Sequence, residues 1–485
     1  MDAFPEVLVT SEYPFFLAGE WARSAAPLSV IFPFDGSVVA RTWLAGDDEV
    51  EQATRAAVAA AGVMRDLPAY ERAAILMAAA DELTERRDEV GRIVCLEVGK
   101  AIRDATAEVD RAAMTFRVAA EEACRISGEM IPLDLAPHGK GRFAVTRRFP
   151  LGPIAAFSPF NFPLNLTAHK LAPAIAAGNP IVLKPASKTP LSALVLAAML
   201  ERAGLPKGAL SVLPMTRETG NHLVTDERYK LLTFTGSSAV GWGMKARAGT
   251  KRVVLELGGN AGVIVDESAD LDYGVKRIAV GGFALAGQSC ISVQRVFVHE
   301  RVFDDFSARL VRKVEALTVG DPRDPATDVG PLIEPGETDR VEAWVQEAVA
   351  DGATVLTGGR RLGAALFAPT VLTGAPETAR VCADEVFAPL VGLYPFTDFA
   401  SAVAAVNRSA YGLQAGVFTR DLQHAFDAFE RLEVGGVIVN DVPAWRIDHM
   451  PYGGVKQSGL GREGPRYAIE EMTELRLMVV NREMV

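Results

Sequence analysis

The regular alternation of short β-rich runs with helical segments is the feature that most constrains the fold of this chain. It begins at Ile154 and continues to Val439. Such runs, separated by helices, predict parallel sheets covered by helices on both faces. The alternation is interrupted at Gly258-Gly259, so we expect two α/β domains that meet there. Strands are expected at 154–157, 181–184, 210–213, 231–234 and 253–257, followed by strand 262–265, helix 270–285, strand 295–298 and helix 301–316.

Two further regions lie outside this alternation. Residues 48–128 are rich in Ala, Glu and Arg, and their apolar residues recur at helical spacing, which predicts helices. Residues 142–149 alternate as a strand does, and 474–480 form a short apolar strand near the end of the chain. A solitary edge strand promotes aggregation unless it pairs. The terminal strand either joins the 140–150 segment in a separate arm or closes its own domain's sheet.

Length and charge limit the classes of protein. A chain of 485 residues is too long for one ordinary core, so two or three domains are expected. Its composition, 49% hydrophobic and 23% charged, is typical of a soluble α/β enzyme. The net charge of −11 argues against nucleic acid or an anionic membrane as a partner. It does not argue against an anionic small substrate, because a local arginine can override a weak overall field.

Cysteine usage and the chain start indicate the compartment. The four cysteines are scattered, without metal-binding spacing, which favours a reducing cytoplasm and argues against structural zinc. We expect no signal peptide, because the first residues lack a basic region and an apolar core. The two uncharged stretches, 149–169 and 278–294, contain several prolines or several polar and glycine residues, so neither predicts a membrane span.

Three side chains are suited to covalent catalysis. Glu256 ends an apolar strand, where a carboxylate is costly to bury without a purpose. Cys290 follows in a loop of small residues, and a thiolate is a strong nucleophile. Asn161 lies between prolines that fix the backbone, so its amide can be aimed at an oxyanion. The set predicts Cys290 as nucleophile, Glu256 as activator of water and Asn161 as oxyanion donor.

The segments that hold these residues, Ser158–Pro163, Glu256–Asn260 and Gly287–Cys290, resemble in sequence and order the aldehyde dehydrogenase superfamily, non-acylating branch. The resemblance runs from about Phe15 to the C-terminus. It implies NAD(P)+-dependent oxidation of an aldehyde to the acid, through a thiohemiacetal and a thioester on Cys290, in a homodimer or homotetramer. It also implies an α/β fold with a Rossmann-type cofactor domain (1–124 and 148–258), an α/β catalytic domain (259–471) and a small β oligomerisation arm (125–147 and 472–485).

The resemblance also implies a cofactor site. Its residues would be Lys184, Ser187, Gly236, Ser237, Gly258, Glu385 and Phe387. The turn at Gly236 leads from a strand into a helix N-terminus, which favours a pyrophosphate. Ser187 stands where NAD-preferring members often carry an acidic residue, so we expect NADP to be tolerated or preferred, with Lys188 as an added cation. Ser187 could equally cap the helix that Thr189-Pro190 introduces.

The tunnel of the resembled family predicts the substrate site. Its residues would be Phe162, Asn165, His169, Ser289, Ile291, Arg446 and His449. These polar side chains favour a small, hydroxylated or anionic aldehyde. The segment 440–454 resembles the branch of lactaldehyde, phosphonoacetaldehyde and succinate-semialdehyde dehydrogenases, although the sequence does not identify the aldehyde. Arg446 could bind a carboxylate or phosphonate, or it could pair with Asp448 or Asp441 without touching substrate.

Other functions remain open at this point. A coenzyme-A-acylating enzyme would pass the thioester to a thiol, but it typically lacks the carboxylate at Glu256. A thiol esterase would use Cys290 without nicotinamide, and a catalytically silent binding protein would have no turnover. We expect Cys95 and Cys124 to be core residues, and Cys382 to be inert.

Overall fold

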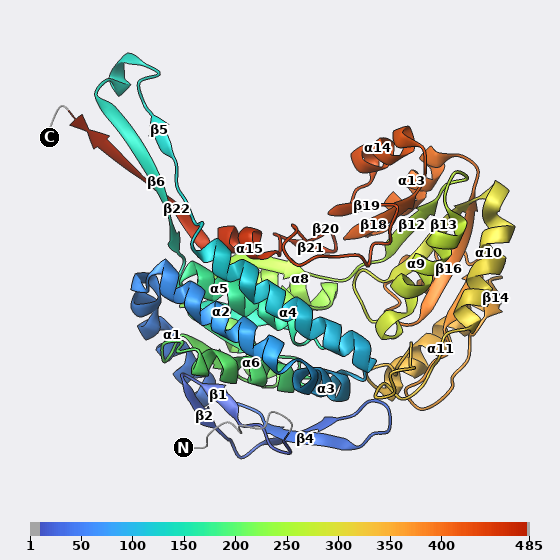
Figure 1. Ribbon diagram of the computed structural model, residues 1–485, viewed down its shortest axis with the longest axis horizontal. Helices are drawn as coiled ribbons and strands as arrows, with labels where there is room; N and C mark the ends of the chain where they lie inside the picture. The colour runs from blue at the N-terminus through green and yellow to red at the C-terminus, as the bar shows by residue number, and fades with distance from the viewer. Residues whose placement is uncertain (1–9, 483–485) are drawn as a thin grey trace.

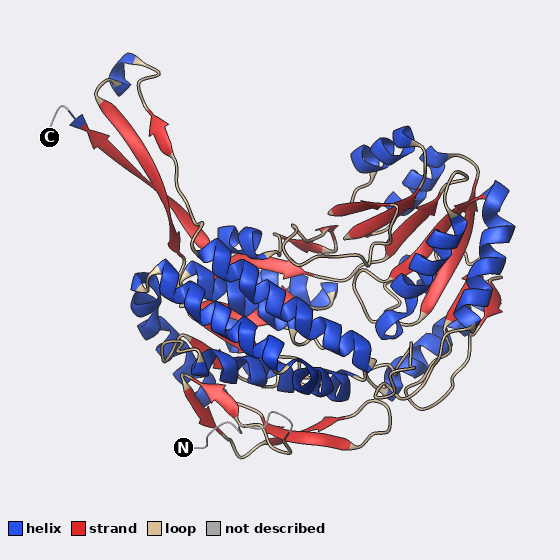
Figure 2. Ribbon diagram, viewed as in Figure 1, coloured by secondary structure: helices blue, strands red, loops and turns tan. Residues whose placement is uncertain are grey.

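The computed structural model describes residues 10–482 as two α/β bodies and a slender arm (Figure 1). The arm projects from the body that contains most of the N-terminal half. Figure 2 shows that helices accompany the strands in both bodies, whereas the arm is made mainly of strands. Residues 1–9, where the sequence predicts no signal peptide, lie outside the described residues. No helix within 10–482 is long and apolar enough to cross a membrane.

The first body is built on an eight-stranded sheet. From edge to edge its order is β2 (Glu20–Ala22), β1 (Phe15–Leu17), β9 (Leu210–Val212), β8 (Ile181–Lys184), β7 (Ile154–Phe157), β10 (Leu231–Thr235), β11 (Arg252–Glu256) and β21 (Gly459–Leu460). The five strands from β9 to β11 run parallel, and β1, β2 and β21 add antiparallel edges. The predicted strands of this half are confirmed within one residue, because each is a short, mostly apolar and mostly buried run.

Helices cover this sheet and give it a large apolar core. The region 48–128 is helical, as expected. The helices are α1 (Asp47–Asp66), α2 (Ala69–Glu85), α3 (Arg87–Val98), α4 (Ile102–Ala123), α5 (Asn165–Ala177), α6 (Leu191–Arg202), α7 (Arg217–Thr225), α8 (Ser238–Arg247) and α15 (Pro465–Glu471), beside a hairpin of β3 (Pro27–Ile31) and β4 (Val38–Trp43). Every residue of α5 is buried, which fixes the segment that follows Asn161.

The second body contains a seven-stranded sheet. Its order is β14 (Thr354–Thr357), β15 (Thr370–Thr373), β16 (Leu390–Phe396), β13 (Val293–His299), β12 (Ala261–Val265), β18 (Gln414–Phe418) and β19 (Gly436–Val439). All neighbours except β14 and β15 are parallel. The other elements are α9 (Leu271–Phe283), the 3-10 turn η2 (Ala284–Gly287), α10 (Glu300–Glu315), α11 (Pro335–Ala350), α12 (Arg380–Ala383), α13 (Phe399–Asn407), α14 (Leu422–Arg431), β17 (Tyr411–Gly412) and β20 (Val455–Lys456).

The terminal strand is part of the separate arm. Strand β22 (Thr473–Asn481) pairs antiparallel with β6 (Arg142–Pro150) along its whole length, and β5 (Met130–Pro132) pairs with the other edge of β6. The short 3-10 turn η1 (Pro137–Gly139) lies between β5 and β6. The alternative, in which the terminal strand closes its own domain's sheet, is wrong.

Two smaller expectations also fail. Cys124, expected in the core, is exposed, because it is the residue that terminates α4 rather than one on its buried face. Ser187 does not cap the next helix. That helix starts at Leu191, and its first amides instead donate to the buried carboxylate of Glu97, at 2.8 Å from Leu191 and 3.0 Å from Ser192.

Candidate active site

Two cavities meet at one thiol and one carboxylate. The larger, of about 450 Å³, is bounded by the ends of the parallel strands of the first sheet and by part of the second body. The smaller, of about 240 Å³, lies between α4, α5, α9 and the loop after β19. Four residues line both cavities, and these are Leu166, Thr235, Glu256 and Cys290. A molecule in either cavity would therefore reach the same two reactive side chains.

Glycine backbone allows the thiol loop to pack closely. A Cβ on Gly259 would lie 2.1 Å from the carbonyl oxygen of Cys290, and a Cβ on Gly287 would lie 2.1 Å from that of Ala388. Gly287 also has a φ of +72°, which favours glycine. The glycines therefore let the thiol loop pack closely against the Gly258-Gly259 turn and against the segment that contains Ala388.

The carboxylate of Glu256 is buried without hydrogen bonds. It ends β11, is 3% exposed, and neither of its oxygens has a hydrogen-bond partner within residues 10–482. Burial raises its pKa well above the ordinary value, and the nearby charge of Glu463 raises it further. Such a group holds a proton more readily than a surface carboxylate, and its oxygens remain available to a water molecule.

The amide of Asn161 points toward the thiol loop. Its Nδ2 donates to the carbonyl oxygen of Gln288 at 2.9 Å, and its Oδ1 accepts from the Phe162 amide at 3.2 Å. An NH₂ group has two hydrogens, so one remains for a ligand beside Cys290. Asn161 lines the larger cavity together with Cys290.

Five of the seven predicted cofactor residues line the larger cavity. Gly236, Ser237, Gly258, Glu385 and Phe387 all line it, whereas Lys184 and Ser187 lie beside Ala186, which lines it too. Ser237 precedes the first residue of α8 and makes no side-chain cap, so the N-terminal amides of that helix remain available to a phosphate. Trp344 and Arg340 also line this cavity and were not expected from the sequence.

Glu385 is held in the same wall. Its Oε1 accepts a 2.8 Å hydrogen bond from the Gly259 amide, and burial raises its pKa to about 7. A Cβ on Gly258 would lie 2.3 Å from Oε2, so the glycine leaves room for this carboxylate. Phe387 packs edge-on against Phe160, with ring centroids 5.9 Å apart. Both side chains are thus held in the wall of the larger cavity, and their contact with the nicotinamide end of a cofactor stays a prediction.

The smaller cavity contains five of the seven predicted substrate residues, Phe162, Asn165, Ser289, Ile291 and Arg446. The two histidines are not among its lining residues. His169 lies behind the wall, where its Nε2 is 2.9 Å from Asp448 Oδ1, and burial lowers its pKa. His449 is exposed, because the loop turns it outward while Asp448 beside it points inward.

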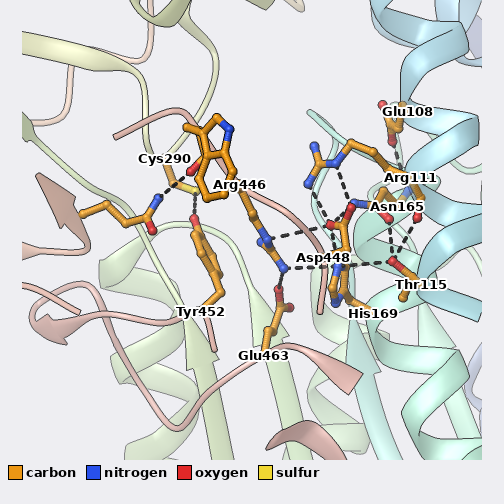
Figure 3. A network of polar contacts seen from close by, with 12 residues as sticks. Glu108, Arg111, Thr115, Asn165, His169, Cys290, Arg446, Asp448, Tyr452 and Glu463 are labelled. Carbon is orange, nitrogen blue, oxygen red and sulfur yellow. Dashed lines mark hydrogen bonds and ion pairs between the residues drawn. The ribbon is translucent and has the colours of Figure 1, made fainter. Parts of the chain in front are cut away.

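Arg446 belongs to a buried network that the sequence did not predict (Figure 3). Its Nη2 lies 3.2 Å from Glu463 Oε2 and 3.1 Å from His169 Nε2, and its Nε is 3.8 Å from Asp448 Oδ1. The expected pairing with Asp441 is wrong, since that carboxylate accepts from Arg277 at 2.6 Å. Arg446 does pair with Asp448, but it also lines the cavity.

Asp448 is shared by two guanidinium groups. Besides facing Arg446, it accepts two hydrogen bonds from Arg111, at 2.8 and 3.0 Å, and one from Asn165 at 2.9 Å. Burial raises the pKa of Asp448, but the hydrogen bond with His169 and the charge of Arg111 hold it well below the usual range. Arg111 also lines the cavity and its side chain is about one-third exposed. With Glu463 counted, two carboxylates face the two guanidinium groups, and the exposed part of Arg111 is what this wall offers to an anion.

A second buried ion pair supports the segment after Asn161. Lys100 pairs with Glu108, and the other oxygen of that carboxylate accepts from the amides of Leu164 and Asn165 at 3.0 and 3.1 Å. The Lys100 ammonium also lies 3.9 Å from the ring centroid of Phe162. The pair therefore ties α4 to the first turn of α5.

Replacing Lys100 by methionine is expected to destabilise the protein strongly. The change leaves the carboxylate of Glu108 buried without its cation, which costs about 3–5 kcal/mol. Thermal unfolding followed by circular dichroism measures the effect as a lower melting temperature. The double variant Lys100→Met/Glu108→Gln should recover part of the loss, and Lys140→Met, at an exposed lysine, should be neutral. An unchanged melting temperature in Lys100→Met would contradict this prediction.

The cavity beside the Cys290 thiol and the buried Glu256 carboxylate is suited to an enzyme that forms a covalent intermediate on sulfur, and comparisons with known proteins supply the family. The model of the aldehyde dehydrogenase family matches residues 21–478. The chain therefore belongs to the aldehyde dehydrogenase family. It is an NAD(P)-dependent oxidoreductase that acts on an aldehyde, and the resemblance noted from the motifs is confirmed.

Three similar proteins are informative. The 3-sulfolactaldehyde dehydrogenase of Priestia aryabhattai is 47% identical over 97% of this chain and 98% of its own length. A crystal structure of aldehyde dehydrogenase 21 from Physcomitrella patens, in complex with the reaction product succinate, is 48% identical, with a TM-score of 0.96 over 97% of this chain and 98% of that one. The glyceraldehyde-3-phosphate dehydrogenase GapN of Methanocaldococcus jannaschii, complexed with NADP, is 39% identical, with a TM-score of 0.90 over 94% and 99%.

Proposed function

We propose that the chain oxidises a small anionic aldehyde, of the sulfolactaldehyde or semialdehyde kind, to its acid. The observation that carries this proposal is the pair of arginines, Arg111 and Arg446, that share Asp448 in the wall of the cavity next to Cys290. A guanidinium group binds sulfonate or carboxylate oxygens well. The names of two similar proteins, which refer to 3-sulfolactaldehyde and succinate, support the same class of substrate.

The chain's own residues supply the covalent steps. Cys290 would add to the aldehyde carbon, and the resulting oxyanion would accept hydrogen bonds from the free hydrogen of Asn161 Nδ2 and from the backbone amide of Cys290. NAD(P)+, when bound, supplies the hydride acceptor, and loss of the hydride leaves a thioester on the sulfur. Glu256 would then remove a proton from water as that water attacks the thioester, and the acid would leave with Cys290 restored.

The substrate proposal is tested by comparing two anionic aldehydes with one neutral aldehyde in two variants. We expect Arg446→Gln and Arg111→Gln to lower kcat/KM for 3-sulfolactaldehyde and succinic semialdehyde by roughly ten- to a hundredfold, because each removes a charge-assisted contact of about 1.5–3 kcal/mol. Lactaldehyde, which has no anionic group, should lose much less. The measurement is the rate of nicotinamide reduction with NAD+ and with NADP+.

The same experiment contains its controls. Arg277→Gln removes a third arginine of the same cavity that is already bound to Asp441, and it should leave the ratio between anionic and neutral aldehydes unchanged. Equal losses for lactaldehyde and the anionic aldehydes would mean that Arg111 and Arg446 are structural. If the wild-type enzyme prefers lactaldehyde, the proposal of an anionic substrate is wrong.

We also infer that NADP+ is accepted in addition to NAD+, and is preferred. Position 187 carries a serine, so no carboxylate there repels a 2′-phosphate. Burial lowers the pKa of Lys184, and the nearby charge of Arg217 lowers it further, to about 8. Lys188 is paired with Glu334 instead, so its charge is partly neutralised. The cations for a 2′-phosphate would therefore be Lys184 and Arg217.

We propose that two or four copies of the chain assemble through the arm, in the cytoplasm that its unpaired cysteines favour. Strand β22 forms one edge of the arm sheet, and several of its apolar side chains are exposed: Leu475, Leu477, Met478 and Val479. Strand β19 forms an edge of the second sheet. Open edges of this kind suit pairing with a second copy.

A further inference from the structure

The thiol of Cys290 has one hydrogen-bond partner within residues 10–482, the hydroxyl of Tyr452. The two atoms, Sγ and Oη, are 3.0 Å apart. Figure 3 shows the phenol pointing at the sulfur from below, with Arg446 beside its ring. Tyr452 lines the same cavity as Cys290, and nothing in the motifs used to predict the site assigned it a role.

The position of this hydroxyl is fixed by its surroundings. Tyr452 is 4% exposed, and its backbone forms an antiparallel bridge with Glu463 through hydrogen bonds of 3.1 and 2.6 Å. The guanidinium carbon of Arg446 lies 3.8 Å from the ring centroid. A cation at this distance over an aromatic face is attracted to it. The phenol is therefore aimed at the sulfur by packing and by a charge.

We propose that Tyr452 donates a hydrogen bond to the thiolate of Cys290 and thereby makes the nucleophile available, so that it acts as a positioning residue for the reaction. A buried thiolate is costly without a partner, and a hydrogen bond to the charged form lowers that cost. This inference rests on the nucleophilic role proposed above for Cys290.

The charges around the sulfur show why this contact matters. Burial raises the pKa of Cys290 to about 12, and the carboxyl groups of Glu385 and Glu256 also raise it. The hydrogen bond from Tyr452 and the charge of Arg446 lower it. Of these four neighbours, Tyr452 is the one in hydrogen-bond contact with the sulfur. The phenol is thus the direct contact that favours the reactive form.

The test measures the thiol without turnover. Tyr452→Phe removes the hydroxyl and keeps the ring. We expect the apparent pKa for alkylation of Cys290 by iodoacetamide to rise by about one unit, and the alkylation rate at neutral pH to fall roughly tenfold. Mass spectrometry of the Cys290 peptide separates this reaction from that of the exposed Cys124. The pH profile of kcat/KM should shift in the same direction.

Tyr229→Phe is the matched control, because it also loses a buried hydroxyl, which lies 2.8 Å from Thr54 Oγ1 in the first body. It should leave the alkylation profile unchanged. An unchanged or lowered pKa in Tyr452→Phe would overturn the proposal, whatever happens to the melting temperature. If that variant does not fold, Tyr452→Met provides the same comparison. Alkylation needs neither aldehyde nor cofactor, so its result can be interpreted even if the proposed substrate class is wrong.

Discussion

Replacing Glu256 by glutamine is expected to stop turnover after a single burst of reduced nicotinamide. Formation of the thioester needs Cys290 and Asn161, which the variant keeps. Hydrolysis needs a base, and the amide of glutamine cannot accept the proton of water. Steady-state kcat should therefore fall by about a hundred- to ten-thousandfold, while one equivalent of reduced nicotinamide per active site still forms. Rapid-mixing absorbance measures the burst, and mass spectrometry of the intact chain detects the acyl adduct.

The pH dependence supplies an independent check on the same residue. Burial and Glu463 raise the pKa of Glu256, so its basic form increases as the pH rises through that raised value. Wild-type turnover should therefore increase with pH over that range, and the residual turnover of the glutamine variant should not show this increase. Cys290→Ala is the negative control, in which neither a burst nor steady-state turnover is expected.

Two observations would contradict the role of Glu256. Full turnover in Glu256→Gln without added thiol would show that another group activates water. Wild-type turnover that requires coenzyme A would identify an acylating enzyme, in which the carboxylate has no hydrolytic task. Ester hydrolysis by the wild type in the absence of nicotinamide would not count against the prediction, because the same thioester would form.

The sequence predicted the elements whose signal is local. Mostly apolar runs such as 181–184 became parallel strands, and the Gly258-Gly259 pair lies between the last parallel strand of the first sheet, β11, and the first strand of the second sheet in the chain, β12. The strand-to-helix turn at Gly236 also lies where expected. In each case a few adjacent residues determine both the conformation and the burial, so tertiary packing did not overrule the pattern.

The buried polar network could not be predicted in the same way. Asp448 binds Arg111 and Asn165, which are 337 and 283 residues away in the chain, and no local pattern records such a pairing. His449, one residue further along, was expected in the tunnel but is exposed, because a one-residue difference in a loop reverses the direction of a side chain. The sequence signal that did exist was the closeness of Arg446 and Asp448 in the chain, which allowed their pairing to be considered. The catalytic roles and the domain boundaries remain predictions.

Replacing Cys290 by serine is expected to abolish nicotinamide reduction, by at least about a thousandfold. The hydroxyl of serine ionises far less readily than a thiol, and the buried site has two carboxyl groups, Glu256 and Glu385, that oppose any anion there. A change of one atom leaves the packing of the loop intact, so cofactor binding, measured by fluorescence titration with NADP+, should stay close to the wild-type value.

The other cysteines make this prediction specific. Cys382 is buried on α12 and Cys124 is exposed at the end of α4, and neither lines the two cavities. Cys382→Ser and Cys124→Ser should therefore keep nicotinamide reduction within about twofold of the wild type, since substitutions away from a functional site usually have small effects. If activity survives in Cys290→Ser but disappears in Cys382→Ser, the nucleophile would be Cys382, and the proposed active site would be wrong. If Cys290→Ser loses nicotinamide reduction but keeps its NADP+ affinity, the defect lies in the covalent step. The site would then still bind the cofactor but lack the sulfur that attacks the aldehyde.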